Sequence, residues 1–158
     1  RRLLKNRTGT TPLGELFLFL AARAQLVQQV IQPALQKQTS VICDRFTDAS
    51  FAYQGYGREL GFETVNTFKQ IVHANLDPDI TFLLDAPVTV IKNRRKLNAN
   101  DRFESESDDF FNRVRNGYLE IADRFSERVK VIDASKPIQD VQTHIVKYLK
   151  ELVKNSGN

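Results

Sequence analysis

An acidic and a basic side chain stand side by side at the end of an apolar segment. Asp44 and Arg45 directly follow residues 40–43, Ser-Val-Ile-Cys, which the apolar run predicts to be a strand. In open α/β sheets, ligands bind at the carboxyl ends of the strands. An arginine there can bind a phosphate with two hydrogen bonds, and an aspartate can organise a metal-bound water. The pair therefore indicates phosphoryl chemistry, with a simple ion pair at a strand end as the alternative.

Alternating strands and helices would position this pair. Apolar runs predict strands at 39–43, 80–85 and 129–133, the second ending in an acid like the first. Helical spacing of apolar residues predicts helices at 12–36, 62–75, 87–97, 107–125 and 137–154, with Pro33 disturbing the end of the first. Such alternation is typical of a three-layer α/β fold, in which helices cover both faces of a parallel sheet.

Composition limits the remaining classes. The chain has 158 residues, 41% hydrophobic and 27% charged, which predicts one globular domain spanning 1–158. We expect a cytoplasmic protein without a membrane partner, because no apolar run or signal segment stands out. The net charge of +4 is too mild and dispersed to indicate nucleic-acid binding. Cys43 is predicted to be a buried strand residue, and His73 and His144 to be surface or core histidines without a metal.

Several segments occur together in a familiar order. These are Phe19–Gln25, Asp44–Gly55, Pro78–Asp85, Asp101–Glu104, Phe110–Arg115 and Val131–Ser135. In order and spacing they closely resemble thymidylate kinase of the bacterial type, across nearly all of the chain. The resemblance implies a P-loop NTPase fold of the nucleotide-kinase type and phosphorylation of dTMP to dTDP with Mg-ATP, a step of dTTP biosynthesis. It also implies a cytoplasmic homodimer.

The resemblance assigns five residues to the base and sugar of dTMP. It implies that Phe19 stacks on the thymine ring, that Arg23 donates to a base carbonyl, and that Ser50 bonds the pyrimidine edge. It implies further that Tyr53 packs beside the sugar and disfavours a 2′-hydroxyl, with Gln54 near base and sugar. Independently, residues 19 and 23 share a helix face, although an apolar helix residue such as Phe19 is more often part of the core.

Other residues are assigned to the phosphates and metal. The resemblance implies that Asp44 organises the magnesium side and that Arg45 contacts phosphate. It places a lid at about 92–104, where Arg95 and Arg102 would stabilise the transferring charge. From the charge pattern alone, this basic segment is an ordinary solvated helix face.

The ATP side is represented only in part. The resemblance implies that Ala134 and Ser135 belong to a loop that runs past the adenine of ATP. The phosphate-binding pattern Gly-x-x-x-x-Gly-Lys-Ser/Thr is absent from the sequence. We expect the first strands and this loop to occupy roughly 40 to 60 residues before Arg1, judged by the size of a βαβ unit. The fragment alone is then predicted to be inactive, and its parent to be the enzyme. The alternatives are a deoxynucleoside kinase of the same fold, or a non-catalytic nucleotide-binding protein that lacks the loop.

Overall fold

The computed structural model describes residues 10–95 and 106–156. Its residue contacts divide into two compact units, the first containing residues up to Asp77 and from 100 to 121, and the second residues 78–99 and 122–158. We describe each unit by itself. The prediction of a single domain stays a prediction.

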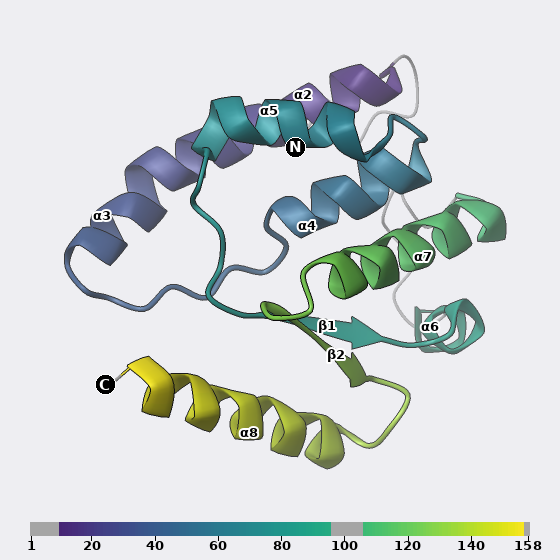
Figure 1. Cartoon of the computed structure of the whole chain (residues 1–158). Helices are drawn as coiled ribbons and strands as arrows, with labels where there is room; N and C mark the ends of the chain where they lie inside the picture. The colour runs from purple at the N-terminus through teal and green to yellow at the C-terminus, as the bar shows by residue number, and fades with distance from the viewer. Residues whose placement is uncertain (1–9, 96–105, 157–158) are drawn as a thin grey trace. The chain divides into compact units, whose positions relative to one another are not determined.

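The first unit opens with a long helical run. Helix α2 spans Pro12–Leu26 (Figure 1). The side chain of Thr11 caps it by accepting a hydrogen bond from the Gly14 amide at 3.1 Å. The run continues as a π-helical turn, η1 (Val27–Ile31), and as α3 (Gln32–Gln36). Because Pro33 has no amide hydrogen to donate, the widened turn before it takes up the predicted disturbance.

The segment 39–43 differs from its predicted form. It contains no strand, since none of the described residues pairs with it. Ile42 is fully exposed, and Cys43 is exposed rather than buried. A strand exists through hydrogen bonds to a neighbour, so the apolar run alone did not suffice to form one.

The segment after Arg45 is helical, where the sequence suggested a loop. Helix α4 (Thr47–Ser50) leads directly into a second π-helical element, η2 (Phe51–Gly57). Helix α5 (Phe62–His73) follows as predicted, and α7 spans Asp108–Arg124. The buried apolar residues of this unit come from α2, η1, η2, α5 and α7: Leu16, Leu20, Val27, Ile31, Phe51, Ala52, Val65, Phe110, Val114 and Ile121.

Two glycines bring η2 and α7 close together. A Cβ on Gly57 would lie 2.7 Å from Val114 Cγ2, and one on Gly117 would lie 2.6 to 2.7 Å from three atoms of Tyr56. Real carbon atoms do not approach so closely, because optimal carbon contacts are about 3.5 to 4.0 Å. The missing side chains therefore permit this packing.

The second unit contains a small parallel sheet. Strand β1 (Thr81–Asp85) pairs with β2 (Val129–Asp133), with Thr81 opposite Val129 and Asp85 opposite Asp133. Helices α6 (Val88–Arg95) and α8 (Ile138–Ser156) belong to the same unit, and the Tyr148 ring of α8 lies 6.3 Å from that of Phe82. Both strands were predicted. The described residues contain two of the three expected strands, so the three-layer arrangement stays a prediction.

No helix in the described parts of the chain has the length and apolar character needed to cross a membrane.

Candidate functional site

A buried arginine joins α2 to the start of α4. Arg23 is only 8% exposed, and its two terminal nitrogens donate to Ser50 Oγ at 2.8 Å and to the Phe46 carbonyl at 3.0 Å. Its guanidinium also lies 5.6 Å from the centre of the Phe46 ring. Burial lowers the pKa of Arg23 to about 10, so the side chain stays charged at neutral pH. The structure thus brings together two residues predicted to bind the base, Arg23 and Ser50.

The neighbouring Arg45 has an unusual backbone. Its φ of 63° lies in the left-handed region, which costs a non-glycine residue about 1 to 3 kcal/mol and occurs preferentially at functional sites. The Arg45 guanidinium lies 5.6 Å from the centre of the Tyr53 ring, within range of a cation–π contact. Arg45, predicted to bind phosphate, and Tyr53, predicted to lie beside the sugar, are therefore in contact.

Tyr118 of α7 borders the same cluster. Its ring stands edge-on to Tyr53, with centroids 6.3 Å apart and planes at 84°. Burial and the nearby Tyr53 raise the pKa of the Tyr118 hydroxyl, and the charge of Arg45 acts in the opposite direction. Asp44 and Asp48 also influence this hydroxyl, so the acidic side chains of the motif lie within its electrostatic reach. We call Arg23, Asp44, Arg45, Ser50 and Tyr53 the acceptor cluster.

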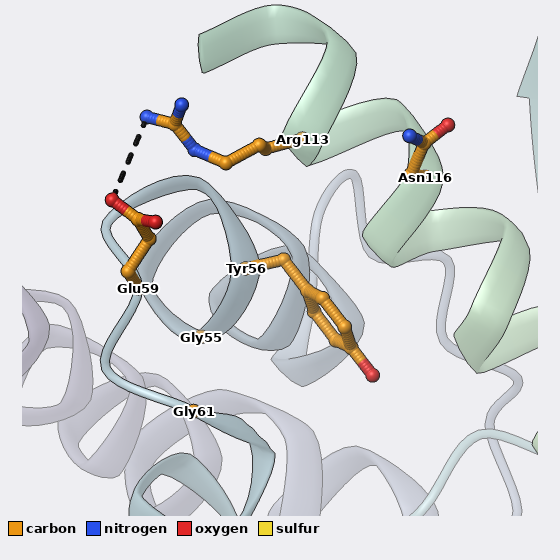
Figure 2. Close-up of a pocket in the computed structure, with 6 residues that line it drawn as sticks. All are labelled: Gly55, Tyr56, Glu59, Gly61, Arg113 and Asn116. Atoms are coloured by element: carbon orange, nitrogen blue, oxygen red, sulfur yellow. Dashed lines mark ion pairs between the residues drawn. The ribbon is translucent and has the colours of Figure 1, made fainter. Parts of the chain in front are cut away.

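A separate hollow of about 320 Å³ opens between η2 and α7. Figure 2 shows its lining residues, with an ion pair of 4.0 Å between Arg113 and Glu59. The lining consists of Gly55, Tyr56, Glu59, Gly61, Arg113 and Asn116, and includes none of the predicted site residues. Arg113 is also occupied by the Gly57 carbonyl, to which two of its nitrogens donate at 3.1 and 3.2 Å. Arg113 therefore connects α7 to η2 and to Glu59 just after it. The hollow is not the predicted substrate site.

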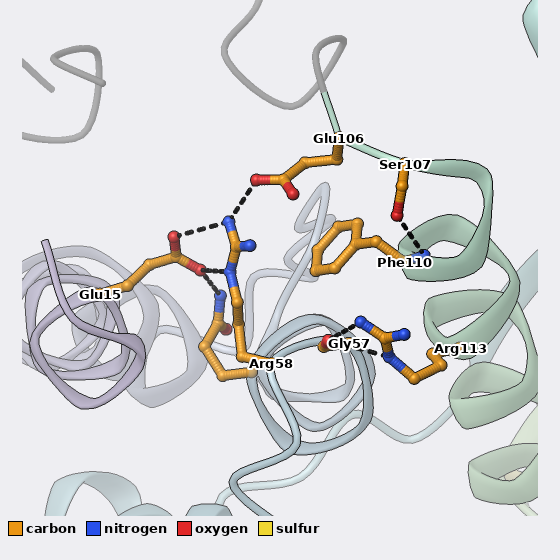
Figure 3. Close-up of polar contacts among 8 residues, drawn as sticks. Glu15, Gly57, Arg58, Glu106, Ser107, Phe110 and Arg113 are labelled. Atoms are coloured by element: carbon orange, nitrogen blue, oxygen red, sulfur yellow. Dashed lines mark hydrogen bonds and ion pairs between the residues drawn. The ribbon is translucent and has the colours of Figure 1, made fainter. Parts of the chain in front are cut away.

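Gln54 belongs to a buried polar network. Its side-chain nitrogen donates to Glu15 Oε1 at 2.8 Å, and both residues are almost completely buried. Arg58 donates to both oxygens of Glu15 at 3.3 Å and to Glu106 at 2.7 Å, while lying 4.6 Å from the Phe110 ring centre (Figure 3). The resemblance implied that Gln54 lies near base and sugar. Gln54 is 2% exposed and its bond to Glu15 holds η2 from the interior, while its place near base and sugar stays a prediction.

In the second unit, the loop after β2 carries Ala134 and Ser135. The Ala134 amide donates to the Asp85 carbonyl at 2.7 Å. The Ser135 amide and hydroxyl both donate to Asp133, which lowers the pKa of that carboxyl. Arg94 of α6 donates to the Ala134 carbonyl at 2.7 Å and to that of Ser135 at 3.3 Å. The loop predicted to pass adenine is therefore fixed by residues of both strands and by a basic helix.

The lid residues are described least. Arg95 ends α6, and Arg102 lies outside the described residues, as does most of the predicted lid at 92–104.

Phe19 is half-buried on α2, one turn before Arg23. Among the described residues, no group of three or more His, Cys, Asp or Glu side chains could hold a metal ion.

Sequence reasoning missed Glu15, Arg58, Arg94 and His73. Glu15 interrupts the same apolar stretch as Arg23, and the argument that a charge in such a stretch needs a partner applies to both. Arg58 carries no comparable signal, since isolated arginines are usually solvated, and Arg94 was placed only within the basic lid segment as a whole. His73 was predicted to be a core or surface histidine, and its 8% exposure confirms the core position.

Known proteins match the chain along most of its length. The sequence profile described as thymidylate kinase matches residues 1–145. The chain is 43% identical to the thymidylate kinase of Kosmotoga olearia over 157 residues, which span 99% of this chain and 76% of that protein. It is 42% identical to that of Methylococcus capsulatus, over 97% of this chain and 74% of the relative.

A solved structure agrees with these relatives. The crystal structure of thymidylate kinase from Ehrlichia chaffeensis superposes with a TM-score of 0.74 at 31% identity, covering 95% of this chain and 71% of that one. The match extends over both units and over the segments from which the resemblance was drawn. The chain belongs to the thymidylate kinase family.

Proposed function

We propose that the protein containing this chain transfers the γ-phosphoryl group of ATP to dTMP and yields dTDP, which feeds dTTP synthesis. The observation that carries the proposal is the acceptor cluster. In this cluster the buried Arg23 donates to Phe46 and Ser50 at the start and end of α4. Arg45, whose backbone is strained, directly precedes Phe46. Nucleoside monophosphates need such a pair, because one end of the ligand is a polar base and the other a phosphate.

In this proposal, Arg23 donates to a carbonyl of the base, and Ser50 completes the polar edge. The bond between them, 2.8 Å long, supports the idea that both act on one group. Phe19 lies one helical turn before Arg23 and offers a half-buried ring for stacking. Tyr53 stands beside the sugar, and Gln54 holds η2 in place from behind through Glu15.

Arg45 would bind the phosphate of dTMP. Its exposed guanidinium is free of the buried networks above, and arginine suits phosphate because it can donate two parallel hydrogen bonds. Asp44 fits magnesium by its chemistry, since Mg²⁺ is usually held by one or two carboxylates together with substrate phosphates rather than by a cage of side chains. When bound, the ion would neutralise phosphate charge.

The donor nucleotide would meet the second unit. Ala134 and Ser135 would pass the adenine, and Arg94 supports this assignment by fixing both carbonyls of the loop. We propose Arg95 and Arg102 as the cations that stabilise the transferring phosphoryl group.

We further propose a cytoplasmic homodimer. Four apolar side chains on α2 and η1 are between 38% and 55% exposed: Leu13, Phe17, Leu26 and Val30. Leu13 and Phe17 lie one turn apart, as do Leu26 and Val30, and such exposed apolar pairs support association with another protein surface. Sedimentation of the full-length protein at two concentrations tests this directly, and a monomer at both would remove the dimer.

The catalytic proposal is tested with the full-length protein. ATP-dependent diphosphate formation is measured from dTMP, UMP and CMP, with thymidine as a fourth substrate. We expect dTMP to be strongly preferred. Equal rates on the three monophosphates would remove the thymidylate assignment, and a preference for thymidine would favour a deoxynucleoside kinase of the same fold.

Arg45→Ala tests the cluster itself. We expect turnover to fall by about 10³-fold, the effect typical of an arginine that stabilises a transferring phosphoryl group. Lys37→Ala is the matched control, because Lys37 is an exposed cation at the end of α3 in the same unit. Turnover of Arg45→Ala within a few-fold of the control would reduce Arg45 to a structural residue.

A further inference from the structure

His73 reaches from the end of one helix to the start of another. It is the last residue of α5, is 8% exposed, and its Nε2 lies 2.6 Å from Thr47 Oγ1 at the start of α4. Its ring also packs against that of Phe46, with centroids 4.9 Å apart. A single side chain therefore contacts two consecutive residues of the motif segment.

These two residues, Phe46 and Thr47, form the start of α4, which contacts Arg23. Phe46 accepts a hydrogen bond from Arg23 through its carbonyl and faces the guanidinium with its ring. Phe46 is also the N-cap of α4, yet it makes no side-chain capping bond. The bond between Thr47 and His73 is therefore a second side-chain contact at the start of α4, beside the bonds that Arg23 donates to Phe46 and Ser50.

The surroundings of His73 favour its neutral form. Burial is the main cause that lowers its pKa, and the cations Lys69 and Arg23 act in the same direction, while Asp77 and the backbone of Leu76 oppose them. The other ring nitrogen, Nδ1, is buried and has no hydrogen-bond partner among the described residues. Buried acceptors are left unpaired more often than buried donors, so the tautomer with hydrogen on Nε2 fits best, donating to Thr47.

We propose that His73 is a positioning residue for recognition of the base. Through its contacts with Thr47 and Phe46 it fixes the start of α4, which in turn holds Arg23 toward the ligand. The inference rests on the proposed function of Arg23. It assigns His73 no contact with substrate. The neutral ring makes this support sensitive to acid, because protonation would place a second cation in a buried position near Arg23.

Kinetics of the full-length enzyme test the proposal. Leucine at position 73 removes the hydrogen bond, whereas glutamine restores a donor that does not titrate. For His73→Leu we expect the KM for dTMP to rise about 10-fold at pH 8, the usual effect of losing one buried hydrogen bond, with kcat and the KM for ATP nearly unchanged. His73→Gln should stay near the wild-type KM at pH 8. His144→Gln, an exposed histidine on α8, is the control.

The pH profile separates positioning from general structural support. The wild-type KM for dTMP should rise as the pH falls below 6.5, and His73→Gln should remove most of that rise. A wild-type KM in His73→Leu, or an unchanged acid rise in His73→Gln, would overturn the proposal. Nitrogen-15 NMR of the histidine rings provides a readout without activity: a neutral ring with hydrogen on Nε2 at pH 7 is expected, and hydrogen on Nδ1 would contradict it. Absence of dTMP phosphorylation by the wild type would instead refute the proposed function.

Discussion

Replacing Gly117 by alanine tests the close packing between α7 and η2. The new Cβ would lie 2.6 to 2.7 Å from Cβ, Cγ and Cδ2 of Tyr56. Tyr56 Cβ is attached to the backbone, so rotation of the ring cannot relieve the overlap. One of the two helical elements must therefore move by roughly 1 Å to restore an ordinary carbon contact.

The expected loss of stability follows from two opposing effects. Overpacking costs about 1 to 3 kcal/mol, and alanine regains about 1 kcal/mol over glycine inside a helix, so we expect a net loss of up to about 2 kcal/mol. Urea unfolding followed by circular dichroism measures it. The free energy of unfolding should fall without a change in the dependence on urea concentration.

Asn116→Ala is the matched control for this experiment. Asn116 is exposed on the same helix, so alanine there should stabilise by about 0.5 kcal/mol through helix propensity alone. If Gly117→Ala were as stable as this control, the contact with Tyr56 would not restrict the position. The packing argument would then be wrong.

Three further results are expected. Arg58→Met should destabilise the protein by about 3 kcal/mol, because it removes the ion pair between Arg58 and the buried carboxylate of Glu15, and adding Glu15→Gln should recover part of that loss in the same urea assay. Arg94→Ala should raise the KM for ATP several-fold while leaving that for dTMP unchanged, since its contacts are to the loop at Ala134; equal effects on both would contradict this role. The contribution of neutral His73 to stability should be complete above pH 6.5 and decline as the pH falls toward its lowered folded pKa, as thermal unfolding of wild type against His73→Gln would reveal.

Periodic apolar patterns predicted the regular elements well. The stripe in residues 62–75 became α5, and the runs near 81–85 and 129–133 became the paired strands. In each case, the partner surface is present among the described residues. The run at 39–43 has an equally apolar sequence but no paired neighbour, and it stays irregular. The apolar pattern therefore predicted a helix or strand correctly only where the described residues also contain the surface that packs against it.

The motif segment was harder to predict. Its small and aromatic residues and its glycines suggested a loop, yet residues 47–57 form helical turns. Two of the glycines suit close approach rather than a turn: Gly57 lies against Val114, and Gly55 near Gly61. Sequence alone cannot distinguish a glycine needed for backbone freedom from one needed for lack of volume.

The candidate site was predicted in part. Arg23 was singled out as a charge in an apolar stretch, and its bond to Ser50 joins two predicted residues. The bond from Gln54 to Glu15, a residue distant in sequence, was not predicted, and the assignment of Gln54 to base and sugar stays a prediction. The support that His73 gives to Thr47 is equally nonlocal. Such roles depend on which residues the fold brings together, and no spacing rule contains that information.

The exposed thiol in the segment 39–43 affects how association should be measured. Cys43 is the only cysteine of the sequence and is exposed, so two chains can become linked through a disulfide in air. Burial raises the pKa of this thiol, which makes the linkage slow rather than absent. Ageing samples would then gain covalent dimers that a sizing column cannot distinguish from a native pair. Sedimentation should therefore be run on fresh protein with a reductant, and compared with Cys43→Ser.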